Sequence, residues 1–242
     1  MQSTTIDLFL DLCLPEGSAQ STVATLGPAG TSSETAARRL TSHMAAGESL
    51  RADESSSTTV LHDSYEDAAN AVRNGSARFL VAANAYSNIA EFYMDPDLRL
   101  VGAFVHETPQ YGIAVVDVEA VPAELRVATH PAPTPLILQL LPVGMRAREV
   151  VAASSTSMAA HAARSGAVDA ALTTGPAAEL YGLTFISKTR TIKMLWSVFC
   201  SAADIELPGP GVLLGESDLF GDTSRGKQPR PDLLSPAAPV GA

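Results

Sequence analysis

The segment TLGPAGTSSETAA, residues 25–37, holds the strongest structural signal in the chain. Leu26 ends an apolar run that suits a buried strand, and Gly30 permits a tight turn in which the backbone can approach a neighbour or a ligand closely. Thr31 then suits the N-cap of a helix, with Glu34 three residues later as its capping-box partner. The segment therefore predicts a strand, a glycine turn and a capped helix in succession.

The first turn of this helix can bind an anion, because a helix N-terminus presents unpaired amides and the positive end of the helix dipole. Thr31 and Ser32 are the candidate contacts there. A second run, Ser154-Ser155-Thr156, precedes another helical pattern and can serve the same purpose. Each run also fits a purely structural N-cap, so the residues alone leave both interpretations open.

Composition excludes several classes of protein. The chain has 242 residues, of which 46% are hydrophobic, enough for one large core or two smaller ones. The formal net charge of −10, without a basic stripe, argues against binding to nucleic acid. No stretch suits a membrane span, and the N-terminal run, interrupted by Asp7 and Asp11, does not resemble a secretory signal. Cys13 and Cys200 fit free thiols in a reducing cytoplasm.

Strand-like and helix-like patterns alternate between residues 22 and 202, which predicts an α/β fold with helices on the faces of a sheet. We expect strands at 21–26, 59–62, 79–83, 126–130, 149–153 and 169–173, and helices after residues 31, 64, 135, 156 and 173. Residues 99–116 can cross between two lobes. Residues 1–21 are interpreted as a loosely ordered leader, and the Pro- and Gly-rich residues 203–242 as a disordered tail.

Four motifs share the order and spacing of one known family. They are Gly-Pro-x-Gly-Thr at 27–31, His130-Pro131, Ser-Ser-Thr at 154–156 and Ala-Ala-x-x-Tyr-Gly-Leu at 177–183. Together they resemble the prephenate dehydratase superfamily. The resemblance implies the two-lobed fold of type II periplasmic binding proteins with a cleft between the lobes, which here would consist of residues 22–104 plus 185–202 and of residues 105–184. Dehydratases commonly continue into a regulatory ACT-type domain that senses phenylalanine, and the short tail does not match one.

Two departures from the dehydratase pattern concern catalysis. Ser32 stands where dehydratases usually carry phenylalanine, a form that looks like the prephenate decarboxylases of bacilysin-type pathways. Dehydratases also carry a Thr-Arg-Phe triplet whose threonine helps to expel the ring hydroxyl, and residues 194–199, MLWSVF, stand at that distance instead. The resemblance thus predicts a carboxy-lyase that removes CO2 from prephenate and retains the ring hydroxyl. The product would be a dihydro-4-hydroxyphenylpyruvate, a precursor for secondary metabolism such as antibiotic biosynthesis.

Such a reaction requires no metal or organic cofactor, because the diene of prephenate accepts the electrons. It does require a proton donor and groups that hold the substrate. His62 and His130 end predicted strands at the edge of the cleft and, with Tyr111 near the predicted hinge, are the candidate proton donors. Asn84, after the strand at 79–83, and Arg190 are candidate substrate contacts. Each histidine also fits a structural role, and Arg190 also fits a solvated basic face.

Three functions stay open at this point. The first is a prephenate decarboxylase, the second a divergent prephenate dehydratase that forms phenylpyruvate, and the third a non-catalytic module that binds a small anion. For each we expect a cytoplasmic protein whose partner is a small molecule and not nucleic acid or a membrane. The sequence leaves a monomer or a homodimer open.

Overall fold

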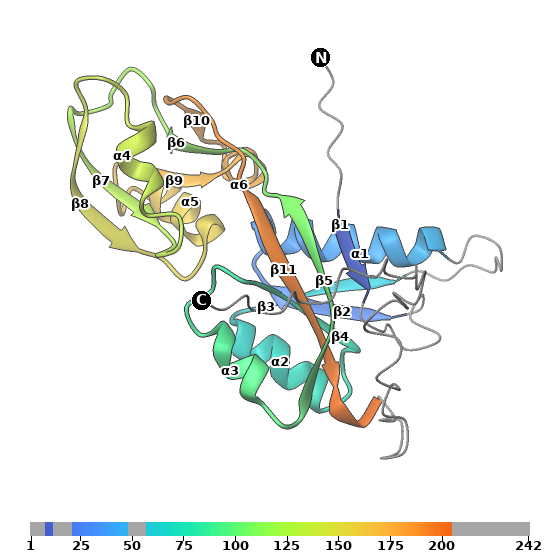
Figure 1. Cartoon of the computed structure of the whole chain (residues 1–242). Coiled ribbons are helices and arrows are strands. Elements are labelled where there is room, and N and C mark those ends of the chain that lie inside the picture. Colours follow the sequence, from blue (N-terminus) through green and yellow to red (C-terminus); the bar gives the residue numbers. More distant parts are fainter. Residues whose placement is uncertain (1–7, 12–20, 48–56, 205–242) are drawn as a thin grey trace, which may run out of the picture. The chain divides into compact units, whose positions relative to one another are not determined.

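The computed structural model describes residues 8–11, 21–47 and 57–204 (Figure 1). Its strands are β1 (Leu8–Asp11), β2 (Thr22–Leu26), β3 (Thr58–His62), β4 (Phe79–Ala83), β5 (Leu98–Glu107), β6 (Tyr111–Val115), β7 (Glu124–Thr129), β8 (Arg146–Ala152), β9 (Ala170–Thr174), β10 (Thr184–Phe185) and β11 (Lys193–Ser201). Its helices are α1 (Ser32–Gly47), α2 (Tyr65–Arg73), α3 (Ile89–Met94), α4 (Leu136–Leu140), α5 (Thr156–Arg164) and α6 (Gly175–Leu180), followed by a 3-10 turn at Ala202–Asp204.

The strands form two mixed sheets. The larger sheet has the order β1-β5-β11-β4-β2-β3, and the smaller sheet has the order β10-β6-β9-β7-β8. Each sheet contains three parallel strands, β3-β2-β4 in one and β8-β7-β9 in the other, joined through helices. β11 pairs with β4 and β6 pairs with β9, both in antiparallel orientation. The predicted two-lobed α/β architecture is confirmed.

Small side chains allow helices to pack closely on both sheets. Ala36 and Ala37 of α1 and Ala68 and Ala69 of α2 have no exposed surface and belong to the core of the larger sheet. In the smaller sheet, neighbours along a strand serve opposite faces, as expected from the period of two. Ile113 packs in the cluster that includes residues of α4, whereas Ala114 packs in the cluster that includes residues of α5 and α6.

Two connections link the sheets. The outward connection joins the end of β5 at Glu107 to the start of β6 at Tyr111, and the return joins β10 to β11. They run side by side, because the Tyr111 amide donates to the Arg190 carbonyl at 2.8 Å and the Arg190 amide donates back at 2.9 Å. Both changes of sheet lie a few residues beyond the expected boundaries at 104/105 and 184/185. The reason is that β5 continues to Glu107 and that β10 still pairs with β6.

The N-terminal region differs from the expected loose leader. Residues 8–11 pair with β5 in antiparallel register, Leu8 opposite Val105 and Asp11 opposite Gly102. The strand supplies backbone partners to the edge of β5 that would otherwise stay open. The rest of the expected leader up to residue 20, and the expected tail from residue 205 onward, lie outside the described residues.

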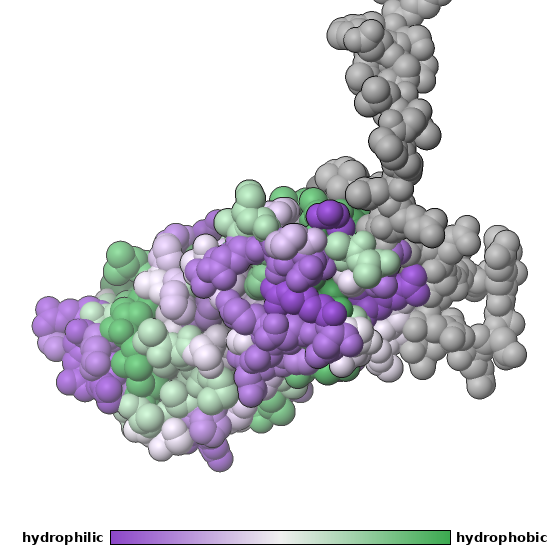
Figure 2. Space-filling model, turned by 90° about the horizontal axis from the view of Figure 1, so that it is seen from below, coloured by the Kyte–Doolittle hydropathy of each residue, from purple (hydrophilic) through white to green (hydrophobic). Residues whose placement is uncertain are grey.

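Apolar side chains also reach the surface. Leu138, Val143 and Met94 are each more than four-fifths exposed. Figure 2 shows one face of the molecule, on which hydrophilic residues cover much of the middle and hydrophobic residues lie in several places around them. Within the described ranges, no helix has the length and apolar character that crossing a membrane requires.

Candidate active site

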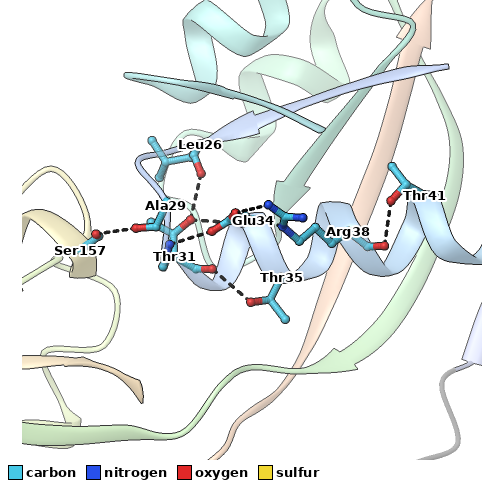
Figure 3. Close-up of polar contacts among 9 residues, drawn as sticks. Leu26, Ala29, Thr31, Glu34, Thr35, Arg38, Thr41 and Ser157 are labelled. Carbon is cyan, nitrogen blue, oxygen red and sulfur yellow. Dashed lines mark hydrogen bonds and ion pairs between the residues drawn. The ribbon is translucent and has the colours of Figure 1, made fainter. Parts of the chain in front are cut away.

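The turn between β2 and α1 has the expected N-cap at Thr31, but the capping-box partner Glu34 binds a different amide from the one expected. The Thr31 hydroxyl donates to the Leu26 carbonyl and accepts from the Glu34 amide, both at 3.1 Å (Figure 3). The Glu34 carboxylate, expected to bond the amide of the N-cap residue itself, instead accepts from the Gly30 amide at 2.7 Å. Glu34 also pairs with Arg38 one turn later. The turn is therefore fixed by its own side chains, and the Thr31 hydroxyl is already engaged.

The start of α1 touches the other lobe. The Ser157 hydroxyl of α5 donates to the Ala29 carbonyl at 2.6 Å, a contact drawn in Figure 3, and the Thr174 hydroxyl before α6 donates to the Gly30 carbonyl at 2.5 Å. A Cβ at Gly30 would lie 2.9 Å from the Ala177 Cα, and Gly30 has a φ of +87°. A larger residue cannot occupy this position without displacing α6.

A pocket of about 210 Å³ lies where these elements meet. Its lining comes from both lobes and consists of Leu26, Thr31, Ser32, Ser33, Tyr65, Ala83, Ala85, Tyr86, Thr108, Tyr111, His130, Ala132, Pro133, Ser155, Thr156, Ile192, Met194 and Trp196. Among these described lining residues there is no Lys, Arg, Asp or Glu. The pocket therefore suits a small ligand that is held by neutral donors and by apolar contacts.

Two adjacent serines at the start of α1 each bind a tyrosine hydroxyl. The Ser32 Oγ lies 2.8 Å from the Tyr111 hydroxyl of β6, and the Ser33 Oγ lies 2.7 Å from the Tyr65 hydroxyl of α2. All four side chains are buried. Burial raises the pKa of Tyr111 and raises that of Tyr65 to about 12, although the hydrogen bonds with the serines partly oppose the shift. Both phenols are thus neutral near pH 7.

His130 follows β7 and is partly buried at the pocket wall. Its Nδ1 accepts a hydrogen bond from the Ala132 amide at 3.2 Å. In the neutral imidazole this places the proton on Nε2, which becomes a donor. Burial lowers the pKa of His130 below its ordinary value, so the neutral form prevails near pH 7.

The second helix start also contributes to the pocket. Ser155 is the N-cap of α5, and its hydroxyl accepts from the Met158 amide at 3.0 Å. Ser155 and Thr156 line the pocket, whereas Ser154 is exposed and does not. Since the first helical amides have no partner within the helix, the start of α5 adds further donors to those of α1.

Six of the predicted site residues are thus brought together at the pocket: Thr31, Ser32, Tyr111, His130, Ser155 and Thr156. Besides Ser154, three predicted residues do not line it. His62 ends β3, which β4 and β2 separate from β11, and its Nε2 is buried with no hydrogen-bond partner among the described residues. The Asn84 side chain bonds Ser197 and Tyr93 instead. The Arg190 side chain is exposed and donates to Gln139. Only the Arg190 backbone touches a residue of the pocket, through its pairing with Tyr111.

Sequence reasoning missed several residues of the pocket. Ser33 directly follows the predicted contact Ser32, and Tyr65 directly follows Ser64, where a helix was predicted to begin. Met194 and Trp196 belong to the segment that replaces the dehydratase triplet. Tyr86, which the sequence offered as a weaker candidate proton donor, also lines the pocket, and its hydroxyl donates to the Glu66 carboxylate. Met194 and Trp196 could have been found from the sequence, because they stand where dehydratases carry the catalytic Thr-Arg-Phe triplet.

Neither cysteine can be placed at the pocket. Cys200 is a buried free thiol on β11, and burial raises its pKa to about 11, which disfavours a reactive thiolate. Cys13 lies outside the described residues. Within the described parts of the chain, no three His, Cys, Asp or Glu side chains gather in a group that could hold a metal ion.

Comparison with known structures defines the class of protein. The chain superposes on prephenate dehydratase from Arthrobacter aurescens in complex with L-Phe with a TM-score of 0.51 and 15% identity, covering 74% of this chain and 60% of that one. It matches a quorum-quenching acylase with a TM-score of 0.52 and 19% identity, covering 78% and 67%. At these identities the likeness shows the fold alone. The fold is thus that of the two-lobed α/β class that includes prephenate dehydratase.

Comparison with curated sequences is more specific. The chain is 37% identical over 182 residues to the prephenate decarboxylase of Bacillus subtilis (strain 168), covering 74% of this chain and 85% of that protein. It is 32% identical over 194 residues to the prephenate decarboxylase of Planktothrix agardhii (strain NIVA-CYA 126/8), covering 78% and 93%. No protein-family model matches. The chain belongs to the prephenate decarboxylase family, as the opening motif and its Ser32 predicted.

Proposed function

We propose that this chain removes CO2 from the ring carboxylate of prephenate, retains the ring hydroxyl and yields a dihydro-4-hydroxyphenylpyruvate. The observation that carries the proposal is the uncharged character of the pocket. No described lining residue is Lys or Arg, and much of the wall is apolar, with Leu26, Ile192, Met194 and Trp196 among its members. Removing a carboxylate from water disfavours its charge, and decarboxylation is the reaction that disperses that charge.

The reaction balances without a redox step. The bond between the ring carbon and the carboxylate breaks, and its electron pair forms a new double bond toward the neighbouring ring carbon. The existing double bond shifts in turn and takes up a proton at the carbon beside the carbinol. One proton is consumed, one CO2 is released, and the ring keeps its hydroxyl and two double bonds, which have become conjugated.

The pocket supplies two candidate donors for this proton. His130 presents its Nε2 hydrogen from the wall formed after β7, because Nδ1 is occupied by the Ala132 amide. Tyr111 presents a phenol that is bonded only to Ser32 among the described residues. His62 is the weaker candidate, since it does not line the pocket. His130→Gln and Tyr111→Phe should therefore slow turnover far more than His62→Gln does.

The segment that replaces the dehydratase triplet offers no acid for the ring hydroxyl, which supports decarboxylation over dehydration. At the position of the missing dehydratase triplet, Met194 and Trp196 line the pocket and neither can deliver a proton. The product then leaves as a non-aromatic keto acid, and we propose that it serves secondary metabolism in the cytoplasm.

Incubation of purified protein with prephenate tests the proposal. Formation of a keto acid that has lost CO2 but not water supports it. Formation of phenylpyruvate supports a divergent dehydratase instead. Tight binding of prephenate without any product supports a non-catalytic anion-binding module.

A further inference from the structure

A second pair of hydroxyls lies at the start of α1, formed by Tyr65 and Ser33. Tyr65, the first residue of α2, is 3% exposed, and Ser33, in the first turn of α1, is 6% exposed. Their hydroxyl oxygens lie 2.7 Å apart, and both side chains line the pocket. The Ala83 amide at the end of β4 donates to the same Tyr65 oxygen at 3.2 Å.

The hydrogen-bond inventory of this pair is incomplete. A phenol hydroxyl offers one hydrogen and accepts up to two hydrogen bonds. The Ala83 amide donates to the Tyr65 oxygen, whereas the bond between the Tyr65 and Ser33 hydroxyls can run in either direction and uses one of their two hydrogens. The other hydrogen of the pair has no acceptor among the described residues, and when Ser33 donates to Tyr65 the unpaired hydrogen is that of the Tyr65 phenol. Since buried polar groups almost always find a partner, a ligand atom in the pocket is the natural one.

The charge balance of the pocket indicates which ligand atom this is. Prephenate carries a ring carboxylate, whose charge disappears in the proposed reaction, and a pyruvyl carboxylate, whose charge persists. Catalysis gains nothing from donors that stabilise the ring carboxylate before it reacts, since such contacts lower the ground state. Donors near the start of α1 therefore serve the pyruvyl carboxylate best, because the helix dipole there also favours a lasting negative charge.

We infer that Tyr65, supported by Ser33, donates a hydrogen bond to the pyruvyl carboxylate of the substrate. The inference rests on the proposed function for the identity of the substrate. Tyr65 is a binding residue in this account, and Ser33 is a positioning residue that acts through Tyr65. Burial keeps the phenol protonated across the working pH range, so it donates throughout.

The test compares Tyr65→Phe with Tyr93→Phe in the full chain. Tyr93 provides a matched control, since its hydroxyl also makes two side-chain hydrogen bonds, to Ser197 and Asn84, but does not line the pocket. Tyr65→Phe should raise KM for prephenate about tenfold or more, with a smaller change in kcat, because a bond to a charged acceptor is lost. Tyr93→Phe should keep KM within about twofold. Thermal unfolding of each variant verifies that it folds.

Phenylpyruvate is the second probe, because it keeps the pyruvyl carboxylate but lacks the ring carboxylate and the ring hydroxyl. Calorimetry should show that Tyr65→Phe weakens binding of phenylpyruvate and of prephenate by similar factors. Ser33→Ala should weaken both less than Tyr65→Phe does, since Tyr65 retains its hydrogen. A folded Tyr65→Phe variant with unchanged KM, or one that weakens prephenate alone, overturns the inference. Absence of turnover in the wild-type chain contradicts the proposed function instead.

Discussion

The Ser32 Oγ and the Tyr111 hydroxyl lie 2.8 Å apart, although 79 positions separate them in the sequence. Ser32 belongs to the first turn of α1 on the larger sheet, and Tyr111 begins β6 in the smaller sheet. The bond therefore joins the two lobes at the wall of the pocket. A phenylalanine at position 32, the residue that the resemblance assigns to dehydratases, could not make it.

Replacement of Ser32 should accordingly lower activity, and a larger side chain at this position should lower it more. Ser32→Phe loses the bond to Tyr111 and places a ring in a pocket of about 210 Å³, so we expect kcat/KM for prephenate to fall well over tenfold. Ser32→Ala loses only the hydrogen bond and should cost about three- to tenfold. Steady-state kinetics measures both values. Equal activity of the wild-type and Ser32→Phe proteins would show that this wall does not contact the substrate.

His130 should give the fold a pH dependence. Its pKa is lowered by burial, so the unfolded chain binds this proton more readily than the folded chain. The His130 contribution to stability is therefore fully present above the ordinary pKa of about 6.5 and is lost as the pH falls toward the lowered value. Urea unfolding between pH 7.5 and 5.5 should show a shallower decline for His130→Gln than for the wild type. Identical slopes would contradict the assigned burial effect.

The two helix caps should carry stability as well as function. From the sequence alone we would expect Thr31→Ala and Ser155→Ala to impair binding more than folding. The structure shows both hydroxyls accepting from helix amides, of Glu34 and Met158. Each alanine variant should therefore lower the free energy of unfolding by about 1 kcal/mol. Denaturant titration checks this value, and a loss below about 0.3 kcal/mol in both variants would show that neither cap matters for stability.

Gly30→Ala tests the contact between α1 and α6. Gly30 and Gly75 both have positive φ, +87° and +76°, but a Cβ at Gly75 meets nothing within 4 Å, whereas one at Gly30 meets the backbone of Ala177. Gly75→Ala should cost roughly 1 kcal/mol from backbone strain alone. Gly30→Ala should cost clearly more and should also reduce turnover. If thermal unfolding gives equal losses for the two variants, the close approach of α6 is unimportant.

Local patterns predicted most of the fold. The strand at 79–83, the Ser64 cap of α2 and the Ser155 cap of α5 were all predicted from short segments whose neighbours in sequence decide their conformation. β1 was missed because a strand of four residues is stabilised by its pairing with β5, a contact about ninety residues away in the sequence. Backbone pairing of that kind leaves no local trace.

The site residues at helix caps could be predicted from the sequence. Those whose place in the pocket depends on the direction of the side chain could not. Asn84 and Ala85 are adjacent, yet only Ala85 lines the pocket, since the Asn84 side chain bonds Ser197 and Tyr93. Tyr65 enters the site through α2 only because Ser33 and the Ala83 amide meet its hydroxyl. Such convergence depends on tertiary packing, which sequence spacing does not specify.

The most direct test of the central claim is the structure of the product formed from prephenate in D2O. Proton NMR of the reaction should show a ring carbon that still carries the hydroxyl, two conjugated double bonds and one deuterium on the carbon beside the carbinol. His130→Gln or Tyr111→Phe should slow this incorporation. Formation of phenylpyruvate, the keto acid that has lost both CO2 and water, would contradict the account.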